Sequence, residues 1–189
     1  MAAPYFFGYG SLVNRATHDF TAPRRAQLSG WRRVWCHTDL RPVAFLSVVP
    51  DAGTRLDGLI AHVPNDDWAG LDQREWAYDR LAVTGAVAHP LAQDVDIAVY
   101  AVPEGRYGAA SVRYPILLSY LDVVVQGYLR EFGPDGVGRF FATTDGWQAP
   151  VLDDRAAPRY PRHQPLTRAE AGVVDTHLGD LGAQIIVAP

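Results

Sequence analysis

The sequence contains one cysteine among its 189 residues, Cys36, and a single thiol cannot form a disulfide within the chain. A fold that does not depend on disulfides is typical of a reducing compartment, so we expect a cytoplasmic location. Cys36 itself is predicted to be a small core residue. One cysteine and six scattered histidines do not provide the ligand spacing of a zinc site, so no metal is expected.

Basic residues are not in excess, because 17 Lys and Arg face 21 Asp and Glu and the formal net charge is -4. We therefore expect no nucleic acid partner. No apolar run approaches the roughly 20 residues that cross a bilayer, and the first residues lack a charged segment followed by an apolar one. The sequence thus predicts neither membrane insertion nor a signal peptide, and nothing in it indicates an oligomeric state.

Three common catalytic and cofactor-binding motifs are also missing. The sequence has no Gly-x-Gly-x-x-Gly and no Gly-Lys-Ser loop, so no nucleotide cofactor is expected. Ser11 does not lie in a Gly-x-Ser-x-Gly elbow, and the adjacent Cys36 and His37 do not make a nucleophile pair. A small molecule remains as the expected partner, without a cofactor.

The composition, with 48% hydrophobic and 20% charged residues, predicts one globular domain over residues 1–189, with a C-terminal extension from about 145. Apolar runs and spacings then predict the elements. The predicted strands cover residues 5–9, 26–37, 43–49, 56–63, 78–83 and 96–102, with a turn at 50–53 and an apolar tail at 185–188. Irregular alternation of strands and helices favours an α+β fold, with a mixed β-sheet curled into a small barrel and flanking helices.

Three helices are expected. Asn65 or Asp66 would cap the first, which reaches Glu75. The second covers residues 116–129 and ends at Gly133-Pro134, before a short apolar segment at 138–144. The third begins with a capping box at Thr167-Arg-Ala-Glu170.

Glycine lies inside one predicted strand and at the end of another. Gly58 lies inside one of them, which indicates a bulge or a close backbone approach. The first strand ends in Gly8-Tyr9-Gly10-Ser11, where glycine would supply the positive φ of a sharp turn. Such a turn can leave N–H groups free to bind an anion or an oxyanion. The alternative is an ordinary connection from a strand to a loop.

Glu75 is a candidate acid or base because it lies beside Trp76 at a predicted helix end. A carboxylate next to large aromatic rings loses solvation, and its pKa rises. Such a glutamate can both accept and donate a proton near neutral pH. The alternative is a surface ion pair with Arg74 or Arg80.

Together these segments resemble the γ-glutamylcyclotransferase superfamily. The run Tyr9-Gly10-Ser11-Leu12 and the run Leu71-Asp-x-x-Glu75 with Tyr78 look closest to its ChaC-like and plant AIG2-like branches. Ser119-Tyr120, followed by Gly127, is similar to the family segment whose tyrosine lines the substrate pocket. The resemblance spans roughly residues 5 to 130.

The resemblance implies an enzyme without a cofactor. In this superfamily the α-amine of a γ-glutamyl amine or peptide attacks its own γ-carbonyl and releases 5-oxoproline. Glu75 would be the catalytic acid and base, while Tyr9, Gly10, Ser11, Leu12, Tyr78 and Tyr120 would bind the substrate. Two alternatives remain: γ-glutamyl acyl removal from a biosynthetic intermediate, and a non-catalytic ligand-binding or regulatory module on the same fold.

Two features depart from the family pattern. Trp76-Ala77 stands where ChaC-like proteins usually carry glycine, and a bulky Trp76 could reshape the pocket and change the specificity for glutathione. The arginine-rich segment 153–162 has no clear counterpart. It is either an extended surface strap or a cover that meets a carboxylate through Arg155, Arg159 or Arg162.

Overall fold

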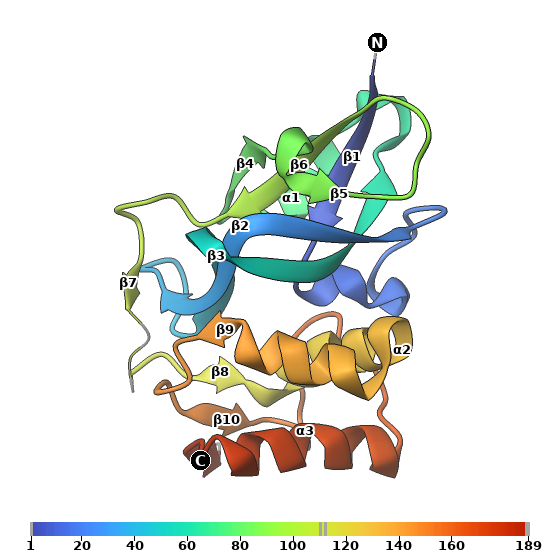
Figure 1. Cartoon of the computed structure of the whole chain (residues 1–189). Helices are drawn as coiled ribbons and strands as arrows, with labels where there is room; N and C mark the ends of the chain where they lie inside the picture. The colour runs from blue at the N-terminus through green and yellow to red at the C-terminus, as the bar shows by residue number, and fades with distance from the viewer. Residues whose placement is uncertain (1, 110, 112, 188–189) are drawn as a thin grey trace.

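The computed structural model describes residues 2–109, 111 and 113–187, which form two β-sheets and three α-helices (Figure 1). The strands are β1 (Ala3–Gly8), β2 (Arg24–His37), β3 (Ala44–His62), β4 (Asp79–Ala82), β5 (Val87–Ala88), β6 (Val95–Ala101), β7 (Gly108–Ala109), β8 (Ile116–Leu117), β9 (Thr144–Asp145), β10 (Val151–Asp153) and β11 (Ile185–Val187). The helices are α1 (Ala69–Arg74), α2 (Leu118–Ala142) and α3 (Arg168–Asp180), with short 3-10 turns η1 (Ser11–Val13), η2 (Arg15–Thr17), η3 (Pro64–Asp66) and η4 (Thr84–Ala86).

The larger sheet is mixed, with the strand order β4-β6-β1-β3-β2-β5 and with β7 and β9 also paired to β2. β1 is parallel to β6 and antiparallel to β3. The long strands β2 and β3 form a curved antiparallel pair, and Figure 1 shows how the sheet curls around them. The predicted α+β fold with a mixed, curled sheet and flanking helices is confirmed, and the barrel is an open one because β4 and β5 end the strand order.

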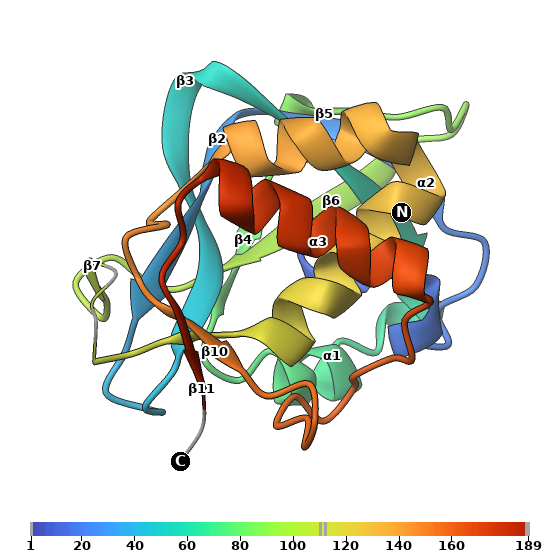
Figure 2. The ribbon, with the colours of Figure 1, turned by 90° about the horizontal axis from the view of Figure 1, so that it is seen from below.

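The smaller sheet joins β8 to the C-terminal part of the chain. β10 is parallel to both β8 and β11. The predicted tail strand is present as Ile185–Val187, whereas Ala188 lies outside the described residues. Seen from below in Figure 2, α3 crosses α2, which in Figure 1 separates it from the larger sheet.

β1 is buried on both faces, and this burial positions the elements around the site. Phe7 belongs to the main core between the larger sheet and α2. Phe6 points into a smaller cluster with Leu12 and Leu71 of α1. Leu71 is 2% exposed, and burying a leucine contributes about 2 kcal/mol, so α1 is held firmly against β1. Cys36 is buried as predicted, and burial raises the pKa of its thiol to about 12.

The predicted turn at residues 50–53 does not end the strand, because β3 runs through it and is paired with β2 on both sides. The pairing is irregular at this place, because residues 51–54 of β3 lie opposite the single residue Gly30 of β2, which has a φ of 82°. Pro50 lies opposite Trp31 at this bulge, where a residue without an N–H group is tolerated. The turn residues therefore form a bulge within β3, while the pairing with β2 continues on both sides of it.

The second helix is longer than predicted. Gly133 leaves the helical conformation, with φ 68° and ψ -172°, but the helix resumes directly at Pro134. Proline fits the first turn of this new segment, where its missing N–H has no helical partner. Val137 and Phe140 are buried and three residues apart, so core packing makes most of the predicted segment 138–144 helical. Neither α2 nor any other helix in the described part of the chain is long and apolar enough to cross a membrane.

The start of one helix was predicted wrongly and that of another correctly. Asn65 and Asp66 do not cap α1, because they lie in η3 with positive φ. Asp67 instead accepts a hydrogen bond at 3.1 Å from the first amide of α1. Thr167 and Glu170 form the predicted capping box at the start of α3.

Candidate active site

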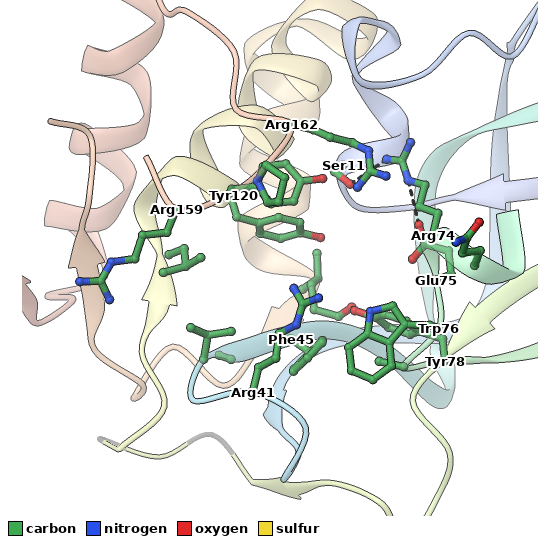
Figure 3. A pocket seen from close by; sticks show the side chains of 18 residues that line it. Ser11, Arg41, Phe45, Arg74, Glu75, Trp76, Tyr78, Tyr120, Arg159 and Arg162 are labelled. Carbon is green, nitrogen blue, oxygen red and sulfur yellow. Dashed lines mark hydrogen bonds and ion pairs between the residues drawn. The ribbon is translucent and has the colours of Figure 1, made fainter. Parts of the chain in front are cut away.

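A cavity of about 310 Å³ opens between the end of α1, the start of β3, the first turn of α2 and residues 159–162 (Figure 3). A smaller pocket of about 30 Å³ adjoins it along the turn that follows β1. Ser11, Glu75, Tyr78 and Tyr120 line both spaces. The structure thus brings together four of the predicted site residues from three separate parts of the chain.

Glu75 is the one carboxylate among the described residues that line the cavity. It follows α1 directly, and its N–H donates to the Leu71 carbonyl at 2.9 Å. Its side chain is 17% exposed and accepts a hydrogen bond from Arg74 Nε at 3.1 Å. Burial raises the pKa of Glu75, while Arg74 and Arg162 act to lower it. The alternative of a surface pair is therefore right about Arg74 but wrong about the surface, and Arg80 pairs with another carboxylate.

The turn after β1 does not use the positive φ that we predicted. Gly10 has a φ of -118°, and neither Gly8 nor Gly10 belongs to the glycines with positive φ. Both are required for space instead. A Cβ on Gly8 would lie 2.7 Å from Leu12 Cβ, and one on Gly10 would lie 2.7 Å from the Tyr120 hydroxyl oxygen. The turn therefore packs directly against Tyr120 at the start of α2.

Tyr9 and Leu12 hold this turn through buried side chains. The Tyr9 hydroxyl donates to a backbone carbonyl of β6 at 2.7 Å. The backbone carbonyl of Tyr9 accepts hydrogen bonds from Arg33 Nε at 3.0 Å and from the Tyr128 hydroxyl at 2.9 Å. Leu12 packs in the cluster that anchors α1. With Gly10, these two predicted residues line the smaller pocket but not the larger cavity.

Tyr78 and Tyr120 place phenol groups beside Glu75. The Tyr78 hydroxyl donates to the Leu46 carbonyl at 3.1 Å. The Tyr120 ring meets the Tyr160 ring edge-on, with centroids 5.0 Å apart. Burial, followed by neighbouring phenols and Glu75, raises the pKa of both tyrosines. Both hydroxyls therefore remain protonated at neutral pH and can act as hydrogen-bond donors.

The interior arginine Arg33 was not predicted as part of the site. It is 1% exposed and donates from Nε to Tyr9 O at 3.0 Å and from Nη2 to Asp57 O at 2.7 Å. It therefore ties the turn to β3. The sequence could have indicated that one of these arginines is buried. Side chains alternate between the two faces of a strand, so one of the neighbours Arg32 and Arg33 must face the core.

The arginine-rich segment has two roles. We call this segment, residues 153–162, the strap. Arg155 bonds Asp122 of α2 at 2.8 Å and an aspartate of α3 at 2.7 Å, so it fastens the strap to both helices. Arg159 and Arg162 instead line the cavity. The segment is thus an extended strap, as one alternative held, and part of it covers the cavity, as the other held.

Trp76 stands at the rim of the cavity rather than in its interior. It lines the cavity but remains 49% exposed. The Arg41 guanidinium lies over its ring at 5.2 Å from the centroid, as Figure 3 shows. The pair therefore forms an outer wall, opposite Tyr120.

Metal-binding side chains do not gather in the described part of the chain. No group of three or more His, Cys, Asp or Glu side chains in it is placed to hold a metal ion. The cavity wall combines arginines, aromatic rings and one carboxylate. This set of groups suits an anionic organic ligand.

The family model for ChaC-like proteins matches residues 4–102, just over half of the chain. The chain belongs to the ChaC-like family. The match includes the turn at Tyr9–Leu12, Glu75 and Tyr78 of this ChaC-like protein, and it ends before Tyr120 and the strap. The predicted superfamily is thereby confirmed.

Three solved structures show the same fold at low sequence identity. A gamma-glutamyl cyclotransferase is 13% identical with a TM-score of 0.58, and the match covers 92% of this chain and 99% of that one. An uncharacterized protein from Homo sapiens is 12% identical with a TM-score of 0.58, over 90% and 97% of the two chains. YkqA from Bacillus subtilis is 19% identical with a TM-score of 0.58, over 74% of this chain, which spans only 53% of YkqA. No curated protein matches this ChaC-like protein in sequence.

Proposed function

We propose that this ChaC-like protein is a γ-glutamyl cyclotransferase that releases 5-oxoproline from a γ-glutamyl amine or peptide. The observation that carries the proposal is the position of Glu75. Its carboxylate is largely buried where the cavity meets the smaller pocket, beside the turn after β1 and two protonated phenols. A proton carrier and hydrogen-bond donors thus surround one small volume.

The reaction needs no nucleophile from the protein. Glu75 accepts a proton from the α-ammonium group of the substrate, and the freed nitrogen forms a bond to the γ-carbonyl carbon. The resulting tetrahedral oxyanion collapses as Glu75 returns the proton to the leaving nitrogen, and the original C–N bond breaks. The ring nitrogen still carries two protons and gives one of them to the departing amine, so the products are 5-oxoproline and an ammonium group. Closure of a five-membered ring has a high effective molarity, so positioning and proton transfer are the main tasks of the protein.

The environment of Glu75 supports both proton transfers. Burial raises its pKa, which makes the carboxylate a stronger base than an exposed glutamate. The Arg74 guanidinium at 3.1 Å opposes this shift and keeps the ionised form accessible. A glutamate whose pKa is raised in this way is suited to accept and return a proton during the reaction.

The turn at Tyr9–Leu12 and the two phenols complete the site. We assign substrate binding to the backbone of this turn, since the side chains of Tyr9 and Leu12 are committed to the core. Preorganised N–H and O–H donors stabilise a developing oxyanion because they need no rearrangement during the reaction. Tyr120 supplies such a hydroxyl group from the start of α2, while the Tyr78 hydroxyl, which donates its proton to the Leu46 carbonyl at 3.1 Å, offers its oxygen to the substrate as an acceptor.

The test is a screen for 5-oxoproline. The purified protein is incubated with glutathione, several γ-glutamyl amino acids and γ-glutamyl-lysine, and the released 5-oxoproline is quantified. We expect product from at least one of them. Release of free glutamate without 5-oxoproline would instead support acyl removal, and binding without any product would support a non-catalytic module.

Substitution Tyr120→Phe tests the phenol next to Gly10. Losing one hydrogen bond to a neutral group costs about 1 kcal/mol, so we expect kcat/KM to fall roughly fivefold. The aromatic contacts with Trp35 and Tyr160 remain, but the hydrogen bond between the hydroxyl and the Ser11 backbone is lost, so the melting temperature should fall by about 2 to 4 °C. Steady-state kinetics and a melting curve check this expectation, and unchanged kinetics would limit Tyr120 to a packing role.

A further inference from the structure

The strap contributes charge to the cavity from outside the part of the chain that the ChaC-like family model matches, which ends at residue 102. Tyr160, Pro161 and Arg162 form one wall of the cavity, on the side of α2. Figure 3 shows the Arg162 side chain extending over Ser11 toward Arg74. The strap therefore places a cation next to the turn and the carboxylate of the proposed reaction centre.

Buried hydrogen bonds fix this part of the strap on α2. Asp154 is 3% exposed and accepts bonds from Ser119 N at 2.8 Å, Ser119 Oγ at 2.6 Å and Arg159 N at 2.8 Å. Tyr160 N donates to Ser119 Oγ at 3.2 Å. Because Ser119 directly precedes Tyr120, the strap and the cavity wall share one anchor. These bonds fix the backbone of the strap beside the cavity, so that the exposed Arg162 side chain starts from a defined position.

Four arginines and one carboxylate line the cavity, but the arginines are not equivalent. Arg74 bonds Glu75 and the backbone, and Arg41 lies over a tryptophan ring. Arg159 extends away from Glu75 in Figure 3. No hydrogen bond or ion pair joins the Arg162 guanidinium to another side chain of the described residues, and it is the strap residue that acts electrostatically on Glu75.

We infer that Arg162 binds the α-carboxylate of the γ-glutamyl substrate, an inference that rests on the proposed function. The α-amine and the α-carboxylate share one carbon atom, so the group that binds the carboxylate must lie beside the base that accepts the proton of the amine. Arg162 meets this condition, with Ser11 and Glu75 as its neighbours across the cavity. A guanidinium also matches the planar carboxylate with paired N–H donors.

Substitution Arg162→Gln tests the inference, with Arg159→Gln as the matched control on the same strap. For a γ-glutamyl substrate with a free α-carboxylate, we expect Arg162→Gln to raise KM about 10- to 100-fold with a smaller change in kcat. Arg159→Gln, at a lining residue that extends away from Glu75, should raise KM by less than Arg162→Gln does. For the analogue whose α-carboxylate is an amide, the wild type and Arg162→Gln should have the same KM.

The two variants and the two substrates distinguish the ways in which the inference could be wrong. A loss that persists with the α-carboxamide analogue would overturn the assignment and point to a carboxylate of the leaving group. An equal rise in KM for both arginine variants would mean that Arg162 acts only through its positive charge near the cavity and does not bind the α-carboxylate.

If the wild type releases no 5-oxoproline, the proposed function fails, but this inference can still be tested. Calorimetry then measures glutathione binding to Glu75→Gln with and without Arg162→Gln. Equal affinity in that pair would overturn it.

Discussion

Substitution Glu75→Gln is expected to reduce 5-oxoproline formation by at least about a hundredfold, because general acid and base catalysis each contribute factors of about 100 to 10,000. Gln keeps the size of the side chain and a carbonyl acceptor for Arg74, but it cannot carry a proton between the two nitrogens of the substrate. Steady-state kinetics measure the loss. A folded variant with wild-type turnover would remove Glu75 from the mechanism.

The same variant should be at least as stable as the wild type. Burial raises the pKa of Glu75 in the folded state, so the ionised form is disfavoured there relative to the unfolded chain. Stability from this group is present at low pH and is lost as the pH rises through the raised pKa. Gln removes this cost near neutral pH, so the melting temperature should not fall.

Two further measurements sharpen the prediction. Glu104→Gln makes the same chemical change at an exposed position outside the cavity, so its turnover should equal that of the wild type. In the wild type, kcat/KM should fall as acid protonates the base, with a midpoint above the ordinary range of a glutamate. Any residual rate of Glu75→Gln should not follow this midpoint.

The position of Glu75 at the end of α1 could be predicted from sequence because it is local, whereas its burial also depends on Ser11 and Tyr120 from distant parts of the chain. The helix end and the aromatic neighbours lie within a few residues of it. The turn at Tyr9–Leu12 and Tyr120, in contrast, meet only because α2 packs closely on the first 3-10 turns. A Cβ on Gly127 would lie 2.7 Å from the backbone N of Asn14. Local sequence patterns carry no information on contacts between distant segments. Only the family resemblance predicted that the turn and Tyr120 belong to one site.

The course of the strap and the reason for the glycines in the turn after β1 could not be predicted from the sequence. Proline and arginine in segment 153–162 indicated an extended chain, but its course depends on the buried bonds between Asp154 and Ser119. The glycines of the turn were expected for their backbone freedom. They are required instead because Leu12 and Tyr120 occupy the space of a side chain, which depends on tertiary packing.

Substitution Gly58→Ala should destabilise the protein by about 3 kcal/mol and lower its melting temperature by roughly 10 °C. A Cβ at this position of β3 would lie 2.4 Å from the carbonyl oxygen of Gly8 and 2.4 Å from the Phe7 ring. The close backbone approach that the sequence predicted is therefore present. The neighbouring strand cannot retreat easily, because β1 is buried on both faces.

The clash also reaches the proposed site. The Asp57 carbonyl, next to Gly58 in the chain, accepts bonds from Arg33 Nη2 at 2.7 Å and from the Tyr128 hydroxyl at 2.6 Å. The same two side chains also bond the Tyr9 carbonyl, Arg33 through Nε and Tyr128 through its hydroxyl. A shift of β3 at Gly58 must therefore displace the turn after β1. Activity should fall even at temperatures where Gly58→Ala is folded.

Gly53→Ala is the matched control in the same strand. Its Cβ would meet only Asp51 Oδ1 at 3.7 Å, an ordinary contact, and Gly53 does not have a positive φ. We expect its stability to lie within about 0.5 kcal/mol of the wild type, since Ala also reduces the entropy of the unfolded chain. Thermal melts and 5-oxoproline release of both variants provide the comparison. Equal stability of the two would contradict the view that β1 and β3 need glycine at this crossing to form the turn.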